Sequence, residues 1–332
     1  MALRSNHVLD FEKPIAELEE RIAALSATNA DGAAETLAQL SQELEDLQRE
    51  VFSKLTPWQK VQVARHPERP QSTDFIRYMV EDFIELHGDR AFSDDRAVVA
   101  GIGRIDGRRV LIVGHRKGKT TRERVDCYFG CAHPEGYRKA LAKMRLAEKF
   151  GLPVVSLIDT SGAYAGIGAE ERGQAQAIAT NLFVMSHLRV PIYCVVVGEG
   201  GSGGALGIGV GDYLAMLEHA YYSVIPPEGC SAILWRDSEH AADAAQALRI
   251  TAKDLVGFGI ADEIIPEPPG GAHRDPRGAA ELLKQAIGRT LDQLAAMPIG
   301  ELLTRRYEKH RHVGRFLEEG SVAPSPEAPP AS

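Results

Sequence analysis

The chain has 332 residues, 44% of them hydrophobic and 25% charged, which is the balance of a soluble globular protein. Its formal net charge of −8 argues against a protein that works mainly on nucleic acid or on an anionic membrane surface. No apolar run approaches the roughly 20 residues that span a bilayer, and residues 1–13 lack the hydrophobic block of a signal peptide. The four cysteines are too scattered for a disulfide framework. We therefore expect a cytoplasmic protein without nucleic-acid or membrane partners.

Residues 1–69 are predicted to form a helical arm that contains a hairpin of two helices over about 14–55. Apolar residues recur there every three or four positions, which places them on one face of each helix: Ile15, Leu18, Ile22 and Leu25, then Leu37, Leu40, Leu44, Leu47 and Val51. The polar segment 26–32 is the expected turn. Because a hairpin this short buries little by itself, we expect its apolar stripe to pack on the main domain or on a partner.

Residues 70–296 are predicted to form one α/β domain. A helix with Phe75, Met79 and Phe83 on one face is followed by a β-hairpin, 97–105 and 109–113, whose turn is Asp106-Gly107. Helix 134–150, strand 153–159, helix 169–188 and strand 191–197 come next, and strands are expected at 213–217 and 221–225. The strand 191–197 is nearly all apolar, which indicates burial on both faces. A helical extension, 297–319, and a tail, 320–332, whose composition is typical of disorder, complete the chain.

The glycine-rich segment GEGGSGGALG at 198–207 is the most informative stretch. It leaves a buried strand and enters a short helix. Glycines let the backbone approach a ligand closely, and the free N–H groups at a helix start can hold an anion or a developing oxyanion. The alternative is a tight turn that only packs helix against strand.

Two catalytic patterns fit this segment superficially. Gly198, Gly200 and Gly203 match the dinucleotide fingerprint G-x-G-x-x-G, but the helix that follows is too short for a parallel crossover. Residues 200–204 also match G-x-S-x-G, so a hydrolase with Ser202 as nucleophile is the main alternative. Its possible partners lie downstream: His219, Asp237, His240 and His273.

A P-loop-like run at 114–120 has the wrong glycine spacing, and we exclude ATP binding there.

A second glycine loop, DTSGAYAGIG at 159–168, also leaves a strand for a helix. Loops that follow neighbouring parallel strands meet at the carboxyl edge of a sheet, where open α/β sheets bind ligands. We therefore expect the two loops to lie side by side and to form a site together.

At these residues the chain resembles the carboxyltransferase alpha subunit of bacterial acetyl-CoA carboxylase. The resemblance covers nearly the whole chain except the tail, and it rests on these segments: DFEKPI at 10–15, LHGDR at 86–90, PEGYRKA at 134–140, GAEERGQ at 168–174, GEGGSGGA at 198–205 and PEPPGGAHR at 266–274. It implies a crotonase-like fold of repeated ββα units. It also implies transfer of a carboxyl group from carboxybiotin to acetyl-CoA, which gives malonyl-CoA in the first committed step of fatty acid synthesis.

The same resemblance implies a transferase that is active only with a beta subunit, in an alpha2-beta2 complex, where the beta subunit holds zinc. Biotin would be attached to a biotin carboxyl carrier protein and charged by biotin carboxylase. This chain has neither a lysine between methionines for biotin attachment nor an ATP-grasp signature.

The resemblance also suggests residue roles. The backbone of Gly203, Gly204 and Ala205 is expected to form the oxyanion hole for biotin. Further substrate-binding positions are expected at Gly200, Gly201, Gly162, Tyr164 and Gly166, with a third rim loop at Pro227, Glu228 and Gly229. The chain departs from the usual family pattern at Ser161, Ala165, Pro226 and Tyr128, which leaves a different acyl-CoA open as an alternative substrate.

Two other groups of residues carry weaker signals. Cys127, Cys131 and His133 lack a fourth ligand at metal-site spacing, so we expect no metal in this chain. The basic run around Lys117, Lys119 and Arg122 is typical of a solvated face. Its functional alternative is contact with CoA phosphates or with an acidic partner.

Overall fold

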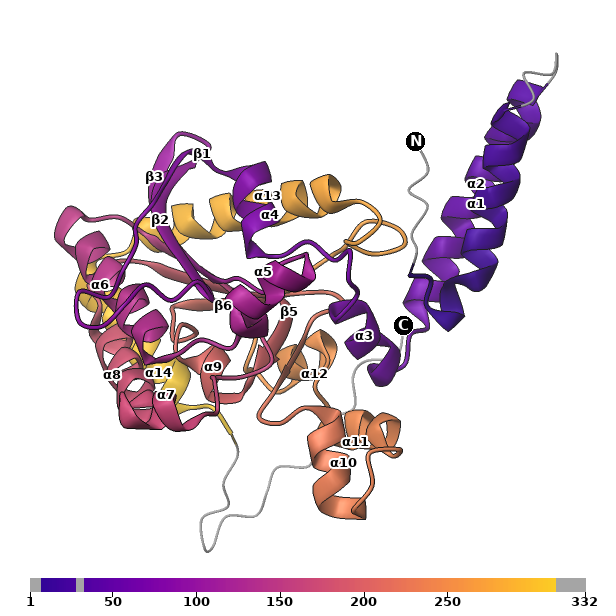
Figure 1. Cartoon of the computed structure of the whole chain (residues 1–332). Coiled ribbons are helices and arrows are strands. Elements are labelled where there is room, and N and C mark those ends of the chain that lie inside the picture. The colour runs from indigo at the N-terminus through magenta and orange to yellow at the C-terminus, as the bar shows by residue number, and fades with distance from the viewer. Residues whose placement is uncertain (1–6, 28–32, 315–332) are drawn as a thin grey trace, which may run out of the picture.

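In the computed structural model of the chain, the described residues are 7–27 and 33–314. They form an eight-stranded sheet flanked by helices, and a hairpin of two helices projects from this body near the N-terminus (Figure 1). The α/β class expected from the sequence is confirmed.

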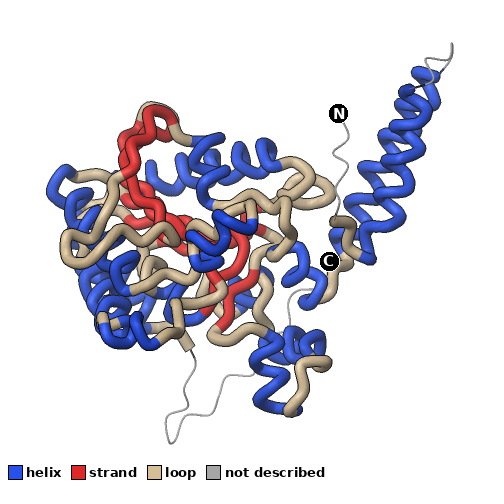
Figure 2. Tube along the Cα trace, viewed as in Figure 1, coloured by secondary structure: helices blue, strands red, loops and turns tan. Residues whose placement is uncertain are grey.

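The strands run through the middle of the body (Figure 2). Their bounds are β1 Glu81–Glu85, β2 Val98–Ile105, β3 Arg108–His115, β4 Val154–Thr160, β5 Ile192–Gly201, β6 Tyr213–Leu217, β7 Tyr221–Ser223 and β8 Glu263–Ile265. The order in the sheet is β1-β2-β3-β4-β5-β6-β8, with β7 paired to the end of β5. Strand β2 is antiparallel to both of its neighbours, β1 and β3, and every strand pairing from β3 onward is parallel.

Helices cover the sheet. Those in contact with its strands include α4 (Ser72–Met79), α6 (Pro134–Phe150) and α13 (Pro276–Ala295), and α8 (Gln174–His187) packs on α6. Every residue of β4 and β5 is buried, as expected for parallel strands covered on both faces. The other helices outside the projecting hairpin are α3 Pro57–Ala64, α5 Thr121–Asp126, α7 Ile167–Glu171, α9 Ser202–Leu206, α10 Pro227–Trp235, α11 Ala241–Leu248, α12 Ala252–Gly257 and α14 Ile299–Arg311, with one-turn 3-10 helices at Asp10–Glu12 (η1) and Tyr128–Gly130 (η2).

Local signals in the sequence explain several boundaries. Helix α6 has proline in its first turn and ends at Gly151, whose φ of 64° is the left-handed conformation that glycine favours there. The turn between β2 and β3 is Asp106-Gly107, with φ of 48° and 74°, as a tight hairpin requires. Both elements were expected from the sequence and are confirmed.

Two expectations for the body are wrong in detail, and one helix of the arm was not predicted. Phe83 lies in β1 and not on a helix with Phe75 and Met79, because α4 ends before the extended residue Val80. The predicted helix 169–188 is two helices, α7 and α8, separated at Gly173, whose φ is 79°. Helix α3, with Pro57 in its first turn and Thr56 as its cap, was not predicted.

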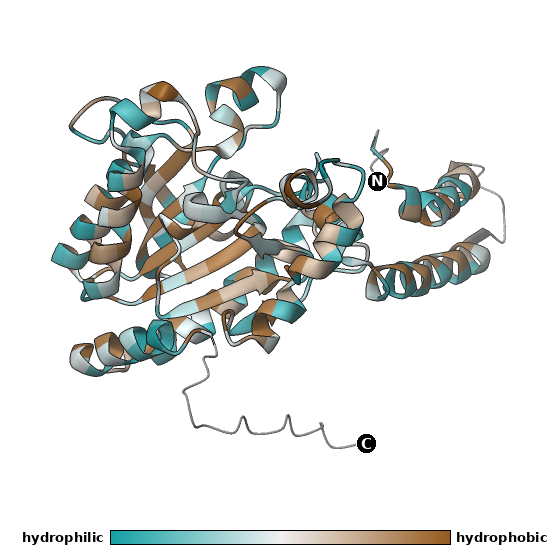
Figure 3. Ribbon diagram, turned by 90° about the horizontal axis from the view of Figure 1, so that it is seen from below, coloured by the Kyte–Doolittle hydropathy of each residue, from teal (hydrophilic) through white to brown (hydrophobic). Residues whose placement is uncertain are grey.

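The projecting hairpin consists of α1 (Lys13–Ala27) and α2 (Ala33–Ser53). Its base is buried, since Ile15 and Phe52 pack with Val63 of α3, and the Phe52 ring also contacts the His219 and His273 rings of the body. Farther out, Ile22 and Leu40 are only half-buried, and the two helices pack on each other. Hydrophobic (brown) and hydrophilic (teal) residues alternate along both helices (Figure 3). The expected packing on the main body therefore holds for the base alone. Residues 28–32 of the predicted turn lie outside the described residues.

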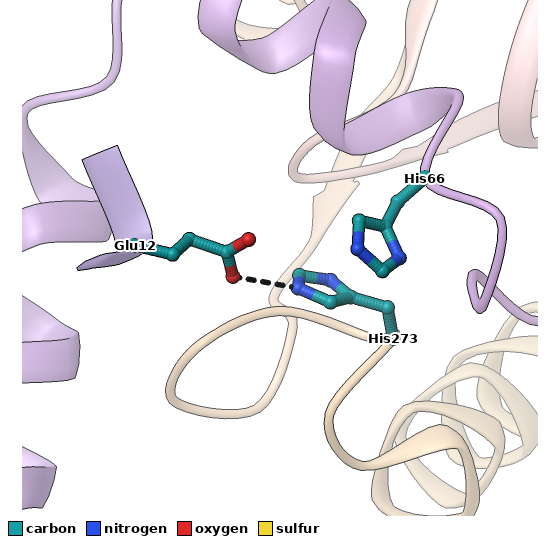
Figure 4. Close-up of side chains that lie close together, drawn as sticks. All are labelled: Glu12, His66 and His273. Atoms are coloured by element: carbon teal, nitrogen blue, oxygen red, sulfur yellow. Dashed lines mark hydrogen bonds and ion pairs between the residues drawn. The ribbon is translucent and has the colours of Figure 1, made fainter. Parts of the chain in front are cut away.

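A buried ionic group fastens the N-terminal segment to the body (Figure 4). The Glu12 carboxylate is 1% exposed and accepts hydrogen bonds from His273 Nε2 at 2.9 Å and from Arg274 Nε at 3.1 Å. The His66 ring lies against the His273 ring, with centroids 4.3 Å apart. We call Glu12, His66, His273 and Arg274 the anchor cluster.

The anchor cluster has the residue types of a metal site, but its hydrogen bonds favour a structural role. Both ring nitrogens of His66 are used by the backbone: Nδ1 accepts from the Glu68 N–H at 3.2 Å, and Nε2 lies 2.7 Å from the His7 carbonyl oxygen. The Arg274 guanidinium places a positive charge on the same Glu12 oxygen that a cation would need. These contacts indicate a hydrogen-bonded fastening.

Two side chains of the C-terminal helix α14 are buried, Leu302 and Arg306. Arg306 is 1% exposed, pairs with Asp212, and donates to the carbonyl oxygens of Met185, Leu188 and Val190. The predicted extension thus contains a helix, while residues 315–332, including the predicted tail, lie outside the described residues. None of the described helices is long and apolar enough to cross a bilayer.

Candidate active site

The two glycine loops meet at the carboxyl edge of the sheet. Strands β4 and β5 are parallel, and Thr160 pairs with Gly200 directly before the loops diverge. A Cβ atom on Gly201 would overlap the Ser161 carbonyl, and one on Gly204 would overlap the backbone of Gly162. The expected juxtaposition is confirmed, and this close approach explains why glycine occupies both positions.

The second loop turns sharply into α9. Ser202 makes this turn with a φ of 48°, after which Gly203 is half-buried while Gly204 and Ala205 are buried. The first N–H groups of a helix have no partner within it, so they are available to a ligand. A Cβ atom on Gly203 would meet only Ile178, at 3.7 Å, so the approach to this backbone is open.

The structure does not support Ser202 as a nucleophile. A nucleophilic serine needs an adjacent base, but no hydrogen bond joins the Ser202 hydroxyl to a histidine within the described part of the chain. The candidate partners are engaged elsewhere: His219 packs on Phe52, His273 bonds Glu12, His240 bonds Asp243, and Asp237 accepts from the Glu239 N–H. The positive φ of Ser202 is explained by the turn into α9.

An aromatic group lies along the first glycine loop. The Tyr164 ring stacks on His133 with centroids 4.0 Å apart, and Tyr128 meets Tyr164 edge-on at 5.5 Å. Burial lowers the pKa of His133 and thereby favours its neutral imidazole. Gly166 lies beneath the Tyr164 ring, where a larger residue would collide with it. We call Tyr128, His133 and Tyr164 the aromatic rim.

The third predicted rim segment, at the start of α10, is tied to the same edge. Pro227 is buried, Gly229 is half-buried, and the Glu228 carboxylate pairs with Arg65 at the end of α3. Arg65 also pairs with Glu199 of β5 at 2.6 Å. The three predicted segments are therefore brought together, the third through Arg65.

The basic run is arranged differently from the expectation. Lys117 Nζ lies 2.7 Å from Asp159 Oδ1 and 2.6 Å from Glu199 Oε2, so its charge is used inside the protein. Lys119 pairs with Asp74 at 2.7 Å, and Arg122 is exposed on α5. Lys117 is therefore unsuited to bind a phosphate or a partner. For Lys119 and Arg122, contact with a phosphate or a partner stays a prediction.

Several residues at this edge were missed by sequence reasoning. Glu199 is held by Lys117, by Arg65 and by the Tyr221 hydroxyl at 2.6 Å. Burial would raise the pKa of Glu199, but the two cations outweigh it and lower the pKa to about 2. The sequence did carry a signal for Glu199, which is a lone acidic residue in an apolar, glycine-rich strand. A buried charge requires partners, so such a residue predicts buried cations nearby.

A cavity of about 230 Å³ opens beside these charges. Its lining includes Arg65, Lys117, Asp159, Ser161 and Glu199. Beneath the loop, burial lowers the pKa of His115 to about 3, and its Nδ1 accepts the Asp159 N–H at 3.3 Å. The edge thus combines an accessible backbone with side chains that are paired to one another.

Comparison with known proteins agrees with this picture. A family model described as acetyl co-enzyme A carboxylase carboxyltransferase-like matches residues 8–314. The acetyl-coenzyme A carboxylase carboxyl transferase subunit alpha of Rhodopirellula baltica is 54% identical over 314 residues, which are 94% of this chain and 98% of that protein. The subunit of the same name from Acaryochloris marina is 52% identical over 318 residues, covering 95% and 98% of the two chains.

Solved structures show the fold at lower identity. Transcarboxylase 12S matches with a TM-score of 0.54 and 21% identity, over 67% of this chain and 41% of that one. The beta subunit of Pseudomonas aeruginosa geranyl-CoA carboxylase matches with a TM-score of 0.54 and 16% identity, over 76% and 46%. This chain therefore spans less than half the length of these two structural neighbours, and it shares their crotonase-like fold. On its sequence and fold together, the chain belongs to the acetyl-coenzyme A carboxylase carboxyltransferase family, among the alpha subunits.

Proposed function

We propose that this alpha subunit handles carboxybiotin and that it transfers the carboxyl group to acetyl-CoA, giving malonyl-CoA. The observation that carries the proposal is the open backbone at Gly203, next to the closely packed loops at Gly204 and Gly162. Such a turn presents N–H donors without side chains in the way. A transferase that stabilises negative charge on a small ring needs this arrangement.

The residues present fit the biotin ring system. Its ureido group is planar and uncharged, so it needs hydrogen-bond donors and apolar walls in place of a counter-ion. The Gly203, Gly204 and Ala205 amides would supply the donors, and the aromatic rim would supply a wall next to Gly162 and Gly166. Gly201 lets the second loop lie against the first, and Gly200 makes room for the Tyr222 ring of β7.

When bound, carboxybiotin supplies the carboxyl group, and its ureido oxygen gains negative charge as that group leaves. The three backbone amides would donate to this oxygen and would stabilise the charge, and loss of one such donor typically costs about 3 to 4 kcal/mol in the barrier. We assign no side-chain base, because the ureido nitrogen that the carboxyl group leaves could accept the proton lost by the acetyl methyl group. Lys117 is paired with both Asp159 and Glu199. Burial lowers the pKa of His115, which contacts the Gly204 backbone, to about 3.

The proposal requires further proteins. A beta subunit would bind acetyl-CoA in an alpha2-beta2 complex, with zinc in that subunit, and biotin would arrive on a carrier protein charged by biotin carboxylase. The length comparison supports this division, because the chain spans only part of the longer carboxyltransferase chains. We expect the purified alpha chain to lack transfer activity and to gain it, with free biotin and acetyl-CoA as substrates, on co-purification with the beta subunit.

The sharpest test of the site is Gly203→Val. The added side chain would enter the open space in front of the loop, so we expect biotin-dependent transfer to fall at least about 100-fold while folding and assembly persist. Gly204→Val is less informative, because its side chain would collide with the backbone of Gly162. The control is Gly300→Val, at a helical glycine that also has open space around it. Near-normal turnover in the Gly203→Val complex would remove this loop from the site.

A further inference from the structure

The ladder between β4 and β5 is interrupted directly before the glycine loops. Ile158 pairs with Val196, but the next pair is Thr160 with Gly200. One residue of β4, Asp159, therefore stands opposite residues 197–199 of β5. Such a bulge leaves backbone groups without ladder partners, and buried backbone groups must find others.

Side chains replace the missing ladder bonds. Asp159 Oδ1 accepts the Glu199 N–H at 3.0 Å, and the Val197 carbonyl oxygen accepts from Arg69 Nε at 2.9 Å. Gly198 makes this possible, because a Cβ atom there would lie 2.5 Å from the Asp159 carboxylate. The two strands that carry the glycine loops are thus joined at their ends through Asp159.

This arrangement brings two carboxylates together, and Lys117 separates them. Its Nζ lies within 2.7 Å of Asp159 Oδ1 and within 2.6 Å of Glu199 Oε2, and its side chain is 17% exposed. Burial would lower the pKa of Lys117, but the two carboxylates raise it above its ordinary value, so the lysine is charged. We call Lys117, Asp159, Glu199 and Arg65 the bulge cluster.

We propose that Lys117 is a positioning residue for the transfer reaction: it clamps the ends of β4 and β5 and thereby fixes the backbone donors of the second glycine loop against the first. This inference rests on the proposed function. Glu199 lies four residues before Gly203, and Asp159 lies three before Gly162, so a shift at the bulge is carried into both loops. Lys117 itself contacts no reacting atom.

Loss of the lysine charge has a distinctive consequence. In Lys117→Met the two carboxylates repel, and one of them must take up a proton to restore their approach. Turnover should therefore be lowest at alkaline pH and recover as the pH falls. The other groups that face the pair are Arg65 and the Tyr221 hydroxyl on Glu199, Glu228 through Arg65, and neutral His115 at the Asp159 N–H.

The experiment uses the assembled alpha–beta complex, with free biotin and acetyl-CoA as substrates. We would measure kcat and KM from about pH 6 to about pH 8 for the wild type, Lys117→Met, Lys117→Arg and Lys117→Met/Asp159→Asn. The matched control is Lys284→Met, since Lys284 pairs with Asp106 at 2.6 Å at the opposite end of β3 and is 21% exposed. Unfolding midpoints are recorded for every complex.

We expect Lys117→Met to lower kcat/KM for biotin about 10-fold at pH 8 and less at pH 6, with KM for acetyl-CoA unchanged. The double variant should recover most of this loss and lose the pH dependence, because one like charge is gone. Lys117→Arg should retain more activity than Lys117→Met, and Lys284→Met should match the wild type.

If the wild-type complex is active and Lys117→Met has the same biotin kinetics at pH 8, the inference about Lys117 is overturned while the proposed function stands. A loss that is independent of pH and equal for both substrates would overturn it as well. If Lys117→Met does not assemble, the double variant decides: recovery supports the clamp, and continued loss contradicts it. A wild-type complex without biotin-dependent transfer would instead overturn the proposed function, and this inference with it.

Discussion

Two buried ionic groups in this molecule use similar chemistry for different purposes. The bulge cluster joins residues 65, 117, 159 and 199, and the anchor cluster joins residue 12 to residues 273 and 274. Both pair carboxylates with cations from distant parts of the chain. The first holds strand ends that carry the glycine loops, whereas the second holds only the N-terminal segment. The consequence of a buried pair therefore depends on the backbone that it fixes.

A third pair connects the two clusters and should show the largest effect. Arg69 bonds the bulge carbonyl of Val197 and pairs with Glu267, which accepts the N–H of Ala272 beside the anchor cluster. Arg69→Met leaves Glu267 buried without its cation, so we expect unfolding free energy to fall by about 3 to 5 kcal/mol. Denaturant unfolding measures this. As a control, Arg77→Met, at an exposed arginine, should change the unfolding free energy by less than about 0.5 kcal/mol. Similar losses in the two variants would contradict the role of burial.

Acid should separate the anchor cluster from ordinary surface pairs. Burial would raise the pKa of Glu12, but His273 and Arg274 outweigh it and lower the pKa from 4.5 to about 2. A lowered folded-state pKa gives stability that is present above about pH 4.5 and is lost as pH falls toward about 2. Glu12→Gln should therefore remove on the order of 2 kcal/mol of unfolding free energy at neutral pH, and the difference from wild type should shrink on acidification. A constant difference at every pH would show that the pair is not the cause.

Activity should discriminate between the two clusters. In Glu199→Gln the Lys117–Asp159 pair persists but the tie to Arg65 is weakened, so we expect kcat for biotin-dependent transfer to fall about 10-fold. Glu12→Gln should leave kcat within about twofold while the N-terminal segment becomes easier to cleave by protease. Steady-state kinetics of the assembled complex and timed proteolysis measure both. Equal losses of kcat would erase the distinction between the clusters.

The smallest effect is expected at Ser202, which lies on the loop without belonging to either cluster. Ser202→Ala should keep activity within about threefold, and Ser202→Gly should match it or exceed it because the φ of 48° suits glycine. Covalent labelling by a fluorophosphonate probe gives an independent measurement. Labelling at Ser202, or a loss of several orders of magnitude in the turnover of Ser202→Ala, would instead support a nucleophilic serine.

Regular elements were predictable because short-range signals determine them. The apolar run of β5, the helix that ends at Gly151 and the Asp106-Gly107 turn each follow from residues adjacent in sequence. The failures have longer-range causes. Phe83 fits a helical stripe in sequence, yet pairing with β2 places it in a strand, where the missing side chain of Gly101 leaves room for its ring.

The candidate site was predictable in its backbone and not in its side chains. Two glycine loops after parallel strands had to meet, and they do at Gly204 and Gly162. The bulge depends on a register shift that no local pattern encodes, so the pairing of Lys117 with Asp159 and Glu199 could not be derived. For that reason the sequence predicts a solvated face or a phosphate or partner contact for Lys117, whereas the structure pairs it inside the protein.

The packed glycine loops also limit how this enzyme can be redesigned. Any side chain at Gly201 or Gly204 meets the facing backbone, so a mutagenesis library directed at these positions would consist mostly of damaged proteins. Tyr128 and Tyr164 are 43% and 36% exposed and pack through their rings alone, which leaves them room to vary. Selection for altered handling of carboxybiotin should therefore diversify the aromatic rim and keep the loops fixed.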